Sequence, residues 1–493
     1  MLFRSLIVPA TLPRLRLTAF IDGAFVEPVG AAEALLNPAT GETIAGVTPA
    51  SSEQVLTAIR AARRAFDEGD WPRMPVFERG QILHAIADGI MARSEDLALL
   101  ECVNGGKPIT GARREVAGAA RVFSYYAGAM DKFFGDTIPV AENILNFTLR
   151  EPLGVVAQIT PWNFPLLAAA WKLAPALAAG CASLLKPSPL TPLSTLLLAE
   201  IIAGCGVPRG IVNVLPGGAE IGQVLAEHPD IDGISFTGST AVGTSVMRAA
   251  AGTIKKVALE LGGKNACIVF DDADIAKAAR SAVGAAFGNA GQSCSARSRF
   301  LVQKSAVAPF TQALVEELAK LKLGSPLDPA TTLGPLISAA HWNRVDHSVR
   351  SAQQSGATLL AGGHRPDELK SGNFYLPTAF GDVSPQLPLY HDEVFGPVCS
   401  ITPFDTEAEA ISEANDSAYG LNGSVWSRDI GRALRVAKGV RTGMVAVNGL
   451  LSASSMSVFA PFGGTKRSGI GRELGMSALA FYTEEKTVTV DLS

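Results

Sequence analysis

From Gly154 onward the chain alternates short β-like runs with longer helical runs, and this alternation constrains the fold more than any other feature. The β-like runs are GVVAQIT, CASLLKP, IVNVLPG, GISFTGS and KKVALELGG, and the helical runs between them are LLAAAWKLAPALAAG, LSTLLLAEIIAG, EIGQVLAEH and AVGTSVMRAAAG. Strands and helices in this rhythm form βαβ units, in which helices cover both faces of a parallel sheet. The sequence therefore predicts an α/β fold with a Rossmann-like parallel sheet.

A second alternating region follows and predicts a second α/β domain. It begins at NACIVF and continues through DIAKAARSAVGAAFGNAG, FLVQKSA, PFTQALVEELAKL and ITPFDTEAEAISEAN to GMVAVNG. Ahead of both regions, residues 53–129 have the apolar spacing of helices, with Ser51 and Ser52 as candidate caps. Because 493 residues exceed one ordinary core, more than one domain is expected.

Two further segments have the pattern of exposed strands. The segment FFGDTIPVAENILNFTLR (133–150) places turn residues between short β-like runs and predicts a hairpin apart from the main core. The alternating tail KTVTV (486–490) is typical of a strand that needs a partner edge.

Composition excludes several classes of protein. The formal net charge is -4 and charged residues make up 18% of the chain, so no basic field favours a nucleic-acid partner. A small-molecule partner is favoured instead. The six cysteines have no CxxC or paired spacing, which argues against a disulfide framework and against a zinc site. A reducing, cytoplasmic setting follows.

No membrane span or firm targeting signal is predicted. The most apolar run, 166–185, is interrupted by Lys172 and Pro175 and suits a buried helix followed by a strand. The first twenty residues contain three arginines and no acid but also two prolines, and we expect a floppy leader rather than a transit peptide.

Polar and glycine-rich segments follow the β-like runs. They are TPWN (160–163), KPS (186–188), PGG (216–218), TGS (237–239) and ELGG (260–263). In open parallel sheets, ligands bind outside the carboxyl ends of the strands. One crevice is therefore expected to collect all five segments.

Three residues of these segments, and Cys294 outside them, each allow two interpretations. Ser239, after Gly238, caps a helix whose N-terminus would suit a pyrophosphate, although an ordinary cap has the same sequence. Lys186 suits a ribose or phosphate or is a solvated lysine. Glu260 suits a general base or a salt bridge. Cys294, in FGNAGQSCSARSRF, is a nucleophile or a small packing residue.

Seven motifs in a fixed order resemble the aldehyde dehydrogenase superfamily over nearly the whole chain. They are PWNFP (161–165), KPS (186–188), FTGS (236–239), LELGGK (259–264), GQSC (291–294), EVFGP (393–397), and PFGG (461–464) with SGIGRE (468–473). Each motif alone is weak, but the seven together are specific.

The resemblance implies a non-acylating, NAD(P)-dependent aldehyde dehydrogenase. Cys294 would attack the aldehyde to form a thiohemiacetal, whose oxyanion Asn163 and the Cys294 N–H would hold. After hydride transfer to the cofactor, Glu260 would activate the water that hydrolyses the thioester. The cofactor-binding residues that the resemblance implies are Trp162, Lys186, Ser188, Gly238, Ser239, Gly262, Glu393 and Phe395.

Cofactor and substrate preference are less well encoded. Many NAD-preferring members have glutamate where this chain has Pro189, so we expect activity with NAD and tolerance of NADP. Phe164, Trp171 and Phe459 are candidate lining residues of the aldehyde tunnel, with core packing as the alternative. The chain resembles betaine- and aminoaldehyde-oxidising relatives, but has Phe164 and Phe462 where these often have tyrosine and tryptophan. Other aliphatic or aromatic aldehydes therefore remain options.

The resemblance also implies a division into three parts. Residues 1–128 and 153–261 would form the dinucleotide-binding domain, 262–463 the catalytic domain, and 129–152 with 479–493 a small β oligomerisation element. A homodimer or homotetramer is expected.

Three other functions compete with this interpretation. A coenzyme-A-acylating relative would use the same thioester, but such relatives usually lack the base at Glu260. A cysteine hydrolase or acyltransferase would need a histidine partner, and none of the six histidines lies in a recognisable motif. A catalytically inactive binding protein would have no use for Cys294, Glu260, Asn163 and Lys186 together.

Overall fold

The runs that alternate after Gly154 form the parallel sheet that their pattern predicts. In this computed structural model, which describes residues 12–449 and 457–493, the central strands β7 to β11 pair in parallel. In spatial order the strands of this first sheet are β19 (Gly469–Ile470), β11 (Lys256–Glu260), β10 (Gly233–Thr237), β7 (Val155–Ile159), β8 (Ala182–Lys186), β9 (Val212–Val214), β1 (Phe20–Ile21) and β2 (Ala24–Phe25). Antiparallel strands extend both edges.

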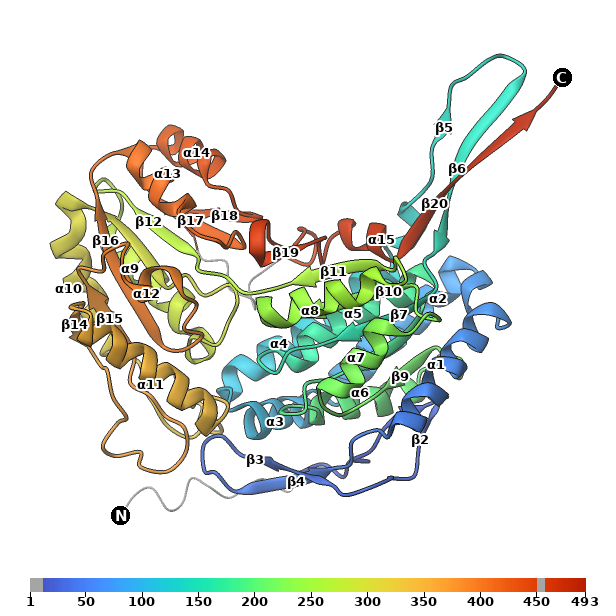
Figure 1. The fold of residues 1–493 in the computed structure, drawn as a ribbon, viewed down its shortest axis with the longest axis horizontal. Coiled ribbons are helices and arrows are strands. Elements are labelled where there is room, and N and C mark those ends of the chain that lie inside the picture. The colour runs from blue at the N-terminus through green and yellow to red at the C-terminus, as the bar shows by residue number, and fades with distance from the viewer. Residues whose placement is uncertain (1–11, 450–456) are drawn as a thin grey trace.

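Helices cover both faces of the first sheet, as expected for βαβ units (Figure 1). One layer contains α2 (Val76–Ala92), α3 (Ser94–Gly105), α4 (Ile109–Ala127), α5 (Pro165–Ala179) and α6 (Leu193–Ala203). The other contains α1 (Ser52–Asp67), α7 (Ala219–Glu227) and α8 (Thr240–Ala251). Helix α1 begins with a capping box, in which the Ser51 hydroxyl accepts from the Gln54 N–H and the Gln54 side chain accepts from the Ser51 N–H.

The second alternating region forms a separate sheet in the other lobe (Figure 1). Its strands, in spatial order, are β14 (Thr358–Ala361), β15 (Thr378–Gly381), β16 (Val398–Phe404), β13 (Arg299–Gln303), β12 (Ala266–Val269), β17 (Asn422–Trp426) and β18 (Met444–Val447). Its helices are α9 (Ile275–Phe287), α10 (Val307–Leu318), α11 (Ala339–Gln354), α12 (Pro388–His391), α13 (Glu407–Asn415) and α14 (Ile430–Gly439). The predicted α/β fold class is confirmed.

The predicted hairpin and the tail form one projecting arm (Figure 1). Strand β5 (Thr137–Ile138) pairs antiparallel with β6 (Ile144–Pro152), and β20 (Thr483–Asp491) pairs with β6 along its whole length. The short helix α15 (Ser477–Phe481) leads into β20. The tail therefore finds its partner edge within its own chain, and the arm leaves Leu145, Leu149 and Val490 exposed.

The N-terminal segment corrects one expectation. Of the twenty residues predicted as a floppy leader, 1–11 lie outside the described residues. Leu15 and Leu17 pack against the core, and Phe20 is buried in β1, which pairs with β9. The apolar side chains of this segment thus anchor it to the sheet edge. A two-stranded ribbon of β3 (Glu33–Leu36) and β4 (Thr43–Val47) follows.

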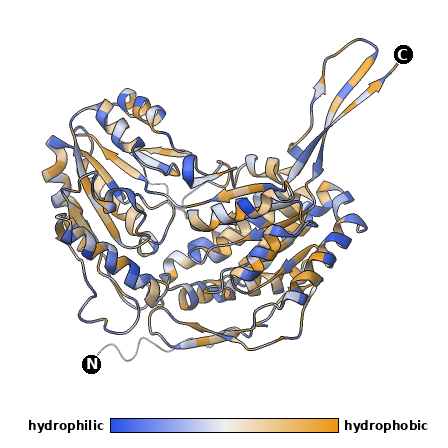
Figure 2. Ribbon diagram, in the orientation of Figure 1, coloured by the Kyte–Doolittle hydropathy of each residue, from blue (hydrophilic) through white to orange (hydrophobic). Residues whose placement is uncertain are grey.

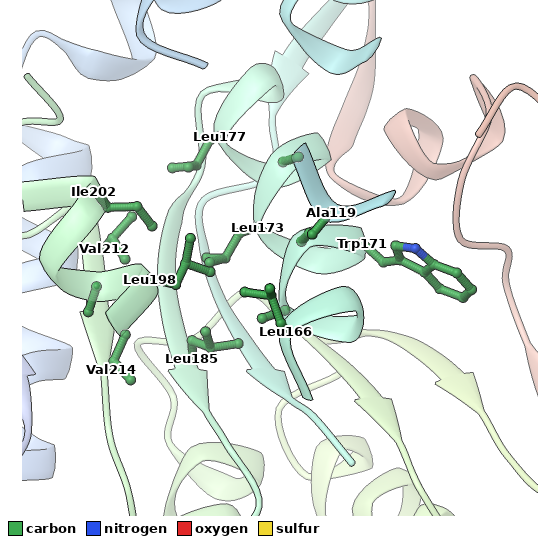
Figure 3. Close-up of a cluster of buried hydrophobic side chains, with 14 of the residues drawn as sticks. Ala119, Leu166, Trp171, Leu173, Leu177, Leu185, Leu198, Ile202, Val212 and Val214 are labelled. Carbon is green, nitrogen blue, oxygen red and sulfur yellow. The ribbon is translucent and has the colours of Figure 1, made fainter. Parts of the chain in front are cut away.

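Helix α5 is buried along its whole length. Apolar residues dominate the sheet strands and the inner helices, whereas the outer helices alternate between apolar and polar residues (Figure 2). In Figure 3, Leu166, Leu173 and Leu177 of α5 point toward Leu185 and Leu198, while Trp171 points away from this cluster. None of the helices in the described part of the chain has the length and apolar character needed to span a bilayer.

Candidate active site

A cavity of about 1400 Å³ lies at the carboxyl ends of β7, β8, β10 and β11. Each of the five polar or glycine-rich segments that follow these strands and β9 contributes to its lining, so the predicted crevice exists. The second lobe contributes the segments around Cys294 and Glu393, and one face of α11. The cavity therefore lies between the two sheets, where both lobes reach a bound molecule.

The cavity brings together thirteen of the fourteen predicted site residues. These are Cys294, Glu260, Asn163, Trp162, Lys186, Ser188, Gly238, Ser239, Gly262, Glu393, Phe395, Phe164 and Trp171. Phe459 is not among the described lining residues. Its side chain is 71% exposed and its ring meets that of Tyr125 edge-on, with centroids 5.3 Å apart. Phe462, three residues later, lines the cavity instead, against Trp171.

Cys294 follows a tight left-handed turn. Asn289, Ala290 and Gly291 have φ angles of 53°, 56° and 71°. The first two belong to a conformation that non-glycine residues adopt at a cost of about 1–2 kcal/mol each. At Gly291 a Cβ atom would clash with the carbonyl oxygen of Gly396. The turn must therefore be held by its surroundings.

Amide side chains hold this turn and the residues after it. Asn265 Nδ2 donates to the carbonyl oxygens of Cys294 and Ala296 at 2.8 and 2.9 Å. The Gln292 side chain accepts from the Ile337 N–H at 2.8 Å. These bonds fix the main chain on both sides of the thiol, which is the condition for a pre-organised nucleophile. Asn265 and Gln292 were not among the site residues predicted from the sequence, although Gln292 lies in the GQSC motif.

Asn163 lies against the same turn. Its Nδ2 donates to the carbonyl oxygen of Gln292 at 3.0 Å. A primary amide has two N–H groups, so one remains for a second acceptor. Because Asn163 and Cys294 both line the cavity, that second acceptor would be an oxygen on a molecule bound next to the thiol.

The thiol of Cys294 is held in its protonated form at neutral pH. Burial raises its pKa, and the carboxyl groups of Glu393, Glu260 and Glu473 raise it further. A base must therefore take its proton before it attacks an electrophile. The other five cysteines are also free thiols. Among the residues described, no group of three or more His, Cys, Asp or Glu is placed to hold a metal ion.

Glu260 is a buried carboxyl group at the end of β11. It is 3% exposed, and neither oxygen has a hydrogen-bond partner among the described residues. Burial raises its pKa well above the usual range, and the neighbouring carboxyl of Glu473 adds to the increase, whereas Lys172 opposes it. A carboxylate with a raised pKa and no fixed partner is a strong base toward a water in the cavity.

Lys172 and Glu473 form a buried ion pair beside Glu260. The Lys172 ammonium also donates to the Ser235 hydroxyl at 2.8 Å. Neither residue was predicted as a site residue from the sequence, where Lys172 interrupts an apolar run and Glu473 ends the SGIGRE motif. A lysine inside an otherwise apolar helix is the signal that identifies such a pair, because a buried ammonium requires a carboxylate.

At the other end of the cavity the residues suit a dinucleotide. The Ser239 hydroxyl accepts from the Val242 N–H at 3.4 Å and caps α8, whose N-terminus opens onto the cavity. Burial lowers the pKa of Lys186 to about 8, and its ammonium donates to the Pro187 carbonyl at 3.3 Å. A helix N-terminus and a buried ammonium without an ion pair among the described residues together fit an anionic, hydroxyl-rich ligand.

Glu393 reaches the cavity from the second lobe. Its Oε1 accepts from the Gly263 N–H at 3.0 Å, and a Cβ on Gly262 would collide with its Oε2. A side chain at position 262 would therefore displace the Glu393 carboxylate from this position. Burial raises the pKa of Glu393 to about 7.

Phe395 has a left-handed φ of 56° and packs edge-on against Trp162, with centroids 5.4 Å apart. His341, on α11, lies 2.7 Å from the Phe395 carbonyl oxygen through Nε2 and completes an aromatic group with Trp162. Burial lowers the pKa of His341 to about 4, so the ring is neutral and donates from Nε2. No sequence motif pointed to His341.

Comparison with known proteins agrees with this geometry. The family model described as "Aldehyde dehydrogenase family" matches residues 25–488. The chain is 44% identical over 477 residues to betaine aldehyde dehydrogenase of Bacillus subtilis (strain 168), covering 96% of each chain. It is 42% identical to peroxisomal aminoaldehyde dehydrogenase 1 of Pisum sativum, covering 95% of each.

Solved structures agree as well. A crystal structure of betaine aldehyde dehydrogenase from Staphylococcus aureus in complex with NAD+ superposes with a TM-score of 0.95 at 42% identity, covering 97% of this chain and 96% of the other. An aldehyde dehydrogenase from Bacillus cereus, in its E194S variant, superposes with a TM-score of 0.94. With a family match over almost the whole chain and relatives above 40% identity, the chain belongs to the aldehyde dehydrogenase family.

Proposed function

We propose that the protein oxidises an aldehyde to the carboxylic acid with NAD as the hydride acceptor, and that Cys294 is the nucleophile. The observation that carries this proposal is the convergence of Cys294, Asn163 and Glu260 on one cavity whose other end suits a dinucleotide. An oxidation through a thioester needs these elements together: a thiol, a donor for an oxyanion, a base for water and a hydride acceptor.

The first step joins Cys294 to the aldehyde. A base removes the thiol proton, the thiolate sulfur bonds to the carbonyl carbon, and the electrons of the C=O bond move to oxygen. The N–H of Asn163 that is not engaged with Gln292, together with the Cys294 backbone N–H, stabilises this oxyanion. The result is a thiohemiacetal that is poised to lose hydride.

Lys186, Ser239 and Glu393 hold the cofactor, with Trp162, Ser188, Gly238, Gly262 and Phe395 around them. NAD, when bound, supplies the acceptor for the hydride that leaves the thiohemiacetal carbon. Glu393 is fixed by the Gly263 N–H, so it presents its second oxygen from a defined position.

Glu260 completes the reaction. Its carboxylate takes a proton from water as the water oxygen attacks the thioester carbon, and the Cys294 thiolate leaves as the acid forms. The raised pKa makes Glu260 a stronger base than an ordinary carboxylate. Its position beside Cys294 in the cavity favours hydrolysis over transfer to coenzyme A, the alternative fate of the thioester.

For the cofactor we propose NAD with tolerance of NADP. Pro189 lines the cavity next to Lys186 and Ser188 and has no carboxylate to repel a 2′-phosphate. The NAD+ complex of the Staphylococcus aureus relative supports NAD.

For the substrate we propose a small cationic aldehyde of the betaine or aminoaldehyde class. The named relatives are betaine and aminoaldehyde dehydrogenases. Trp171 and Phe462 meet at a centroid distance of 5.0 Å beside the cavity, and Phe164 lines it nearby. Aromatic faces attract an ammonium group as well as an apolar chain.

For the organisation of the protein we propose the three parts expected from the sequence. Residues 1–128 and 153–261 bind the dinucleotide, and 262–463 carry the thiol. The arm of 129–152 and 479–493 joins subunits of a homodimer or homotetramer. Exposed Leu145, Leu149 and Val490 on the arm support this assembly. A cytoplasmic location is proposed from the free thiols.

Replacement of Cys294 by Ala should abolish aldehyde oxidation, by at least ~10³-fold, because no other thiol lines the cavity among the described residues. Glu260→Gln should retain a single burst of NADH and lose steady turnover, since acylation precedes the hydrolysis to which Glu260 is assigned. Stopped-flow absorbance at 340 nm distinguishes the burst of NADH from steady turnover. The control Cys205→Ala, at a half-buried position just after α6 that does not line the cavity, should behave as wild type. Normal turnover in either active-site variant refutes the mechanism.

The pH profile of kcat should report Glu260. A carboxyl group with a raised pKa becomes a base only as the pH rises through that value, so kcat should increase with pH to an alkaline plateau. Glu473→Gln removes a like charge and frees Lys172, and both changes lower the pKa of Glu260. The midpoint of the rise in kcat on the acid side of the profile should therefore shift to lower pH by about one unit. The exposed Glu484→Gln serves as the control. A midpoint that is unchanged, or that shifts to higher pH, contradicts the assignment of this titration to Glu260.

Cofactor preference should respond to residue 189. Wild-type protein should reduce both NAD and NADP. Pro189→Glu should lower kcat/KM for NADP relative to NAD by about tenfold or more, because a carboxylate then faces the 2′-phosphate. Equilibrium binding of both nucleotides, followed by tryptophan fluorescence, tests the same change without turnover. If the wild type rejects NADP, another residue provides the selectivity.

The arm should mediate assembly. Light scattering should give at least twice the 51.3 kDa chain mass. Leu149→Asp places a charge on an exposed apolar position of β6 and should shift the protein toward monomer, whereas Leu434→Asp, similarly exposed on α14, should not. A wild-type monomer at micromolar concentration would rule out the proposed assembly.

A further inference from the structure

Another buried lysine, Lys107, lies behind the cavity wall at Phe164. Lys107 forms ion pairs with Glu101, at 3.0 Å, and with Glu115. All three side chains are less than a tenth exposed. None of the three lines the cavity, and the proposed reaction uses none of them. This Lys107 cluster therefore needs its own explanation.

The Lys107 cluster touches the wall of the cavity at Phe164. The Lys107 ammonium lies 4.8 Å from the centroid of the Phe164 ring, and Phe164 is a lining residue. Glu101 Oε1 also accepts from the Ser194 hydroxyl at 2.6 Å and from the Leu166 N–H at 3.3 Å. The Leu166 N–H belongs to the first turn of α5, so one carboxylate fixes both the lysine under the ring and the helix that follows it.

The cluster has one more negative charge than positive charge. Two carboxylates share one ammonium, and burial raises the pKa of Glu115 to about 7, so Glu115 is ionised at pH 8.5. The nearest arginines on α4, Arg113 and Arg114, are exposed, and Arg113 pairs with Glu95 at 2.8 Å. They compensate the buried charge poorly because water screens them.

A second buried group lies farther along α5. Lys172 pairs with Glu473, while burial holds the neighbouring Glu260 carboxyl in its neutral form. This second group therefore has no excess charge in the resting site. The net negative charge near the cavity-lining residues of α5 comes from the Lys107 cluster.

The Phe164 ring alone does not provide a strong attraction for a cation in the cavity. The Lys107 ammonium already interacts with the quadrupole of the Phe164 ring from one face. The ring therefore attracts a second cation at its other face less strongly. The two carboxylates of the cluster outnumber its one ammonium, and this net negative charge would attract a cation in the cavity. Burying three charges costs free energy that apolar residues of the same volume would not, so stability alone does not account for them.

We propose that the Lys107 cluster determines the preference for cationic aldehydes, by fixing the Phe164 ring and by placing one net negative charge behind it. This inference rests on the proposed oxidation of aldehydes and names the group that selects the substrate charge. One unit of charge at roughly 10 Å, in surroundings of dielectric constant about 20, changes the affinity for a monocation by about tenfold.

The test compares two aldehydes of the same shape. Betaine aldehyde has a trimethylammonium group where 3,3-dimethylbutanal has an uncharged tert-butyl group. At pH 8.5 the wild type should have the higher kcat/KM for betaine aldehyde. Glu115→Gln should lower the ratio of the two kcat/KM values by about tenfold, through KM for the cation, while the neutral aldehyde changes less than twofold. Glu115→Asp, which keeps the charge, should retain most of the preference.

Two controls separate the charge from a structural effect. Glu95→Gln removes an exposed carboxylate at the same side of the molecule and should leave the ratio unchanged. In the wild type, 0.5 M KCl should leave the ratio unchanged as well, because salt does not screen a buried cluster. This measurement remains available if Glu115→Gln fails to fold.

Distinct outcomes overturn distinct statements. Equal losses for both aldehydes in Glu115→Gln, an unchanged ratio, or a wild-type ratio that collapses in 0.5 M KCl each overturn the role of the Lys107 cluster. They leave aldehyde oxidation in place. A wild type that oxidises both aldehydes equally well overturns the cationic substrate class together with this inference. No NADH from either aldehyde overturns the proposed function itself.

Discussion

Burial of charge around α5 is the constraint on which the rest of the site depends. The helix is surrounded by protein along its whole length, so every charged group that approaches it must be matched inside the protein. Lys172 is matched by Glu473 and Lys107 by Glu101 and Glu115. These pairs fix where α5 begins and how it rotates, and thereby which of its residues reach the cavity. Trp171 faces the cavity because the leucines of the same helix face the core (Figure 3).

The same burial sets the chemistry of the thiol and the base. Burial raises the pKa of both Cys294 and Glu260, so each is held in its neutral form in the resting site and each becomes more reactive once deprotonated. The turn before Cys294 contributes differently. Its left-handed residues are retained only because amide side chains from other segments bind its main chain. The nucleophile is therefore positioned by main-chain bonds rather than by packing of its own side chain.

Much of the fold and of the site could be predicted because the pattern of each segment agreed with the fold that the whole chain adopts. The alternation of strands and helices predicted the first sheet and the edge at which a ligand would bind. Ligands generally bind outside the carboxyl ends of the strands in open parallel sheets. Lys172, Glu473 and His341 were not selected, because their roles depend on partners far away in sequence. Phe459 and Phe462 illustrate a second limit. Both are aromatic and nearly adjacent, and only the main-chain path places one in the cavity and the other at 71% exposure.

Segments near the end of the sequence complete structures that begin much earlier in the chain. Tyr126 donates to the carbonyl oxygen of Gly475, 349 residues later, and β19 adds to the edge of a sheet whose other edge is β1 and β2. The first lobe can therefore be completed only after synthesis has passed β19 and Gly475. Until then β6 and β11 present unpaired edges, so the growing chain is exposed to association with other chains. Loop closure over such separations also makes this lobe slow to form. Premature termination before residue 469 would leave the β11 edge of the sheet open rather than give a smaller enzyme.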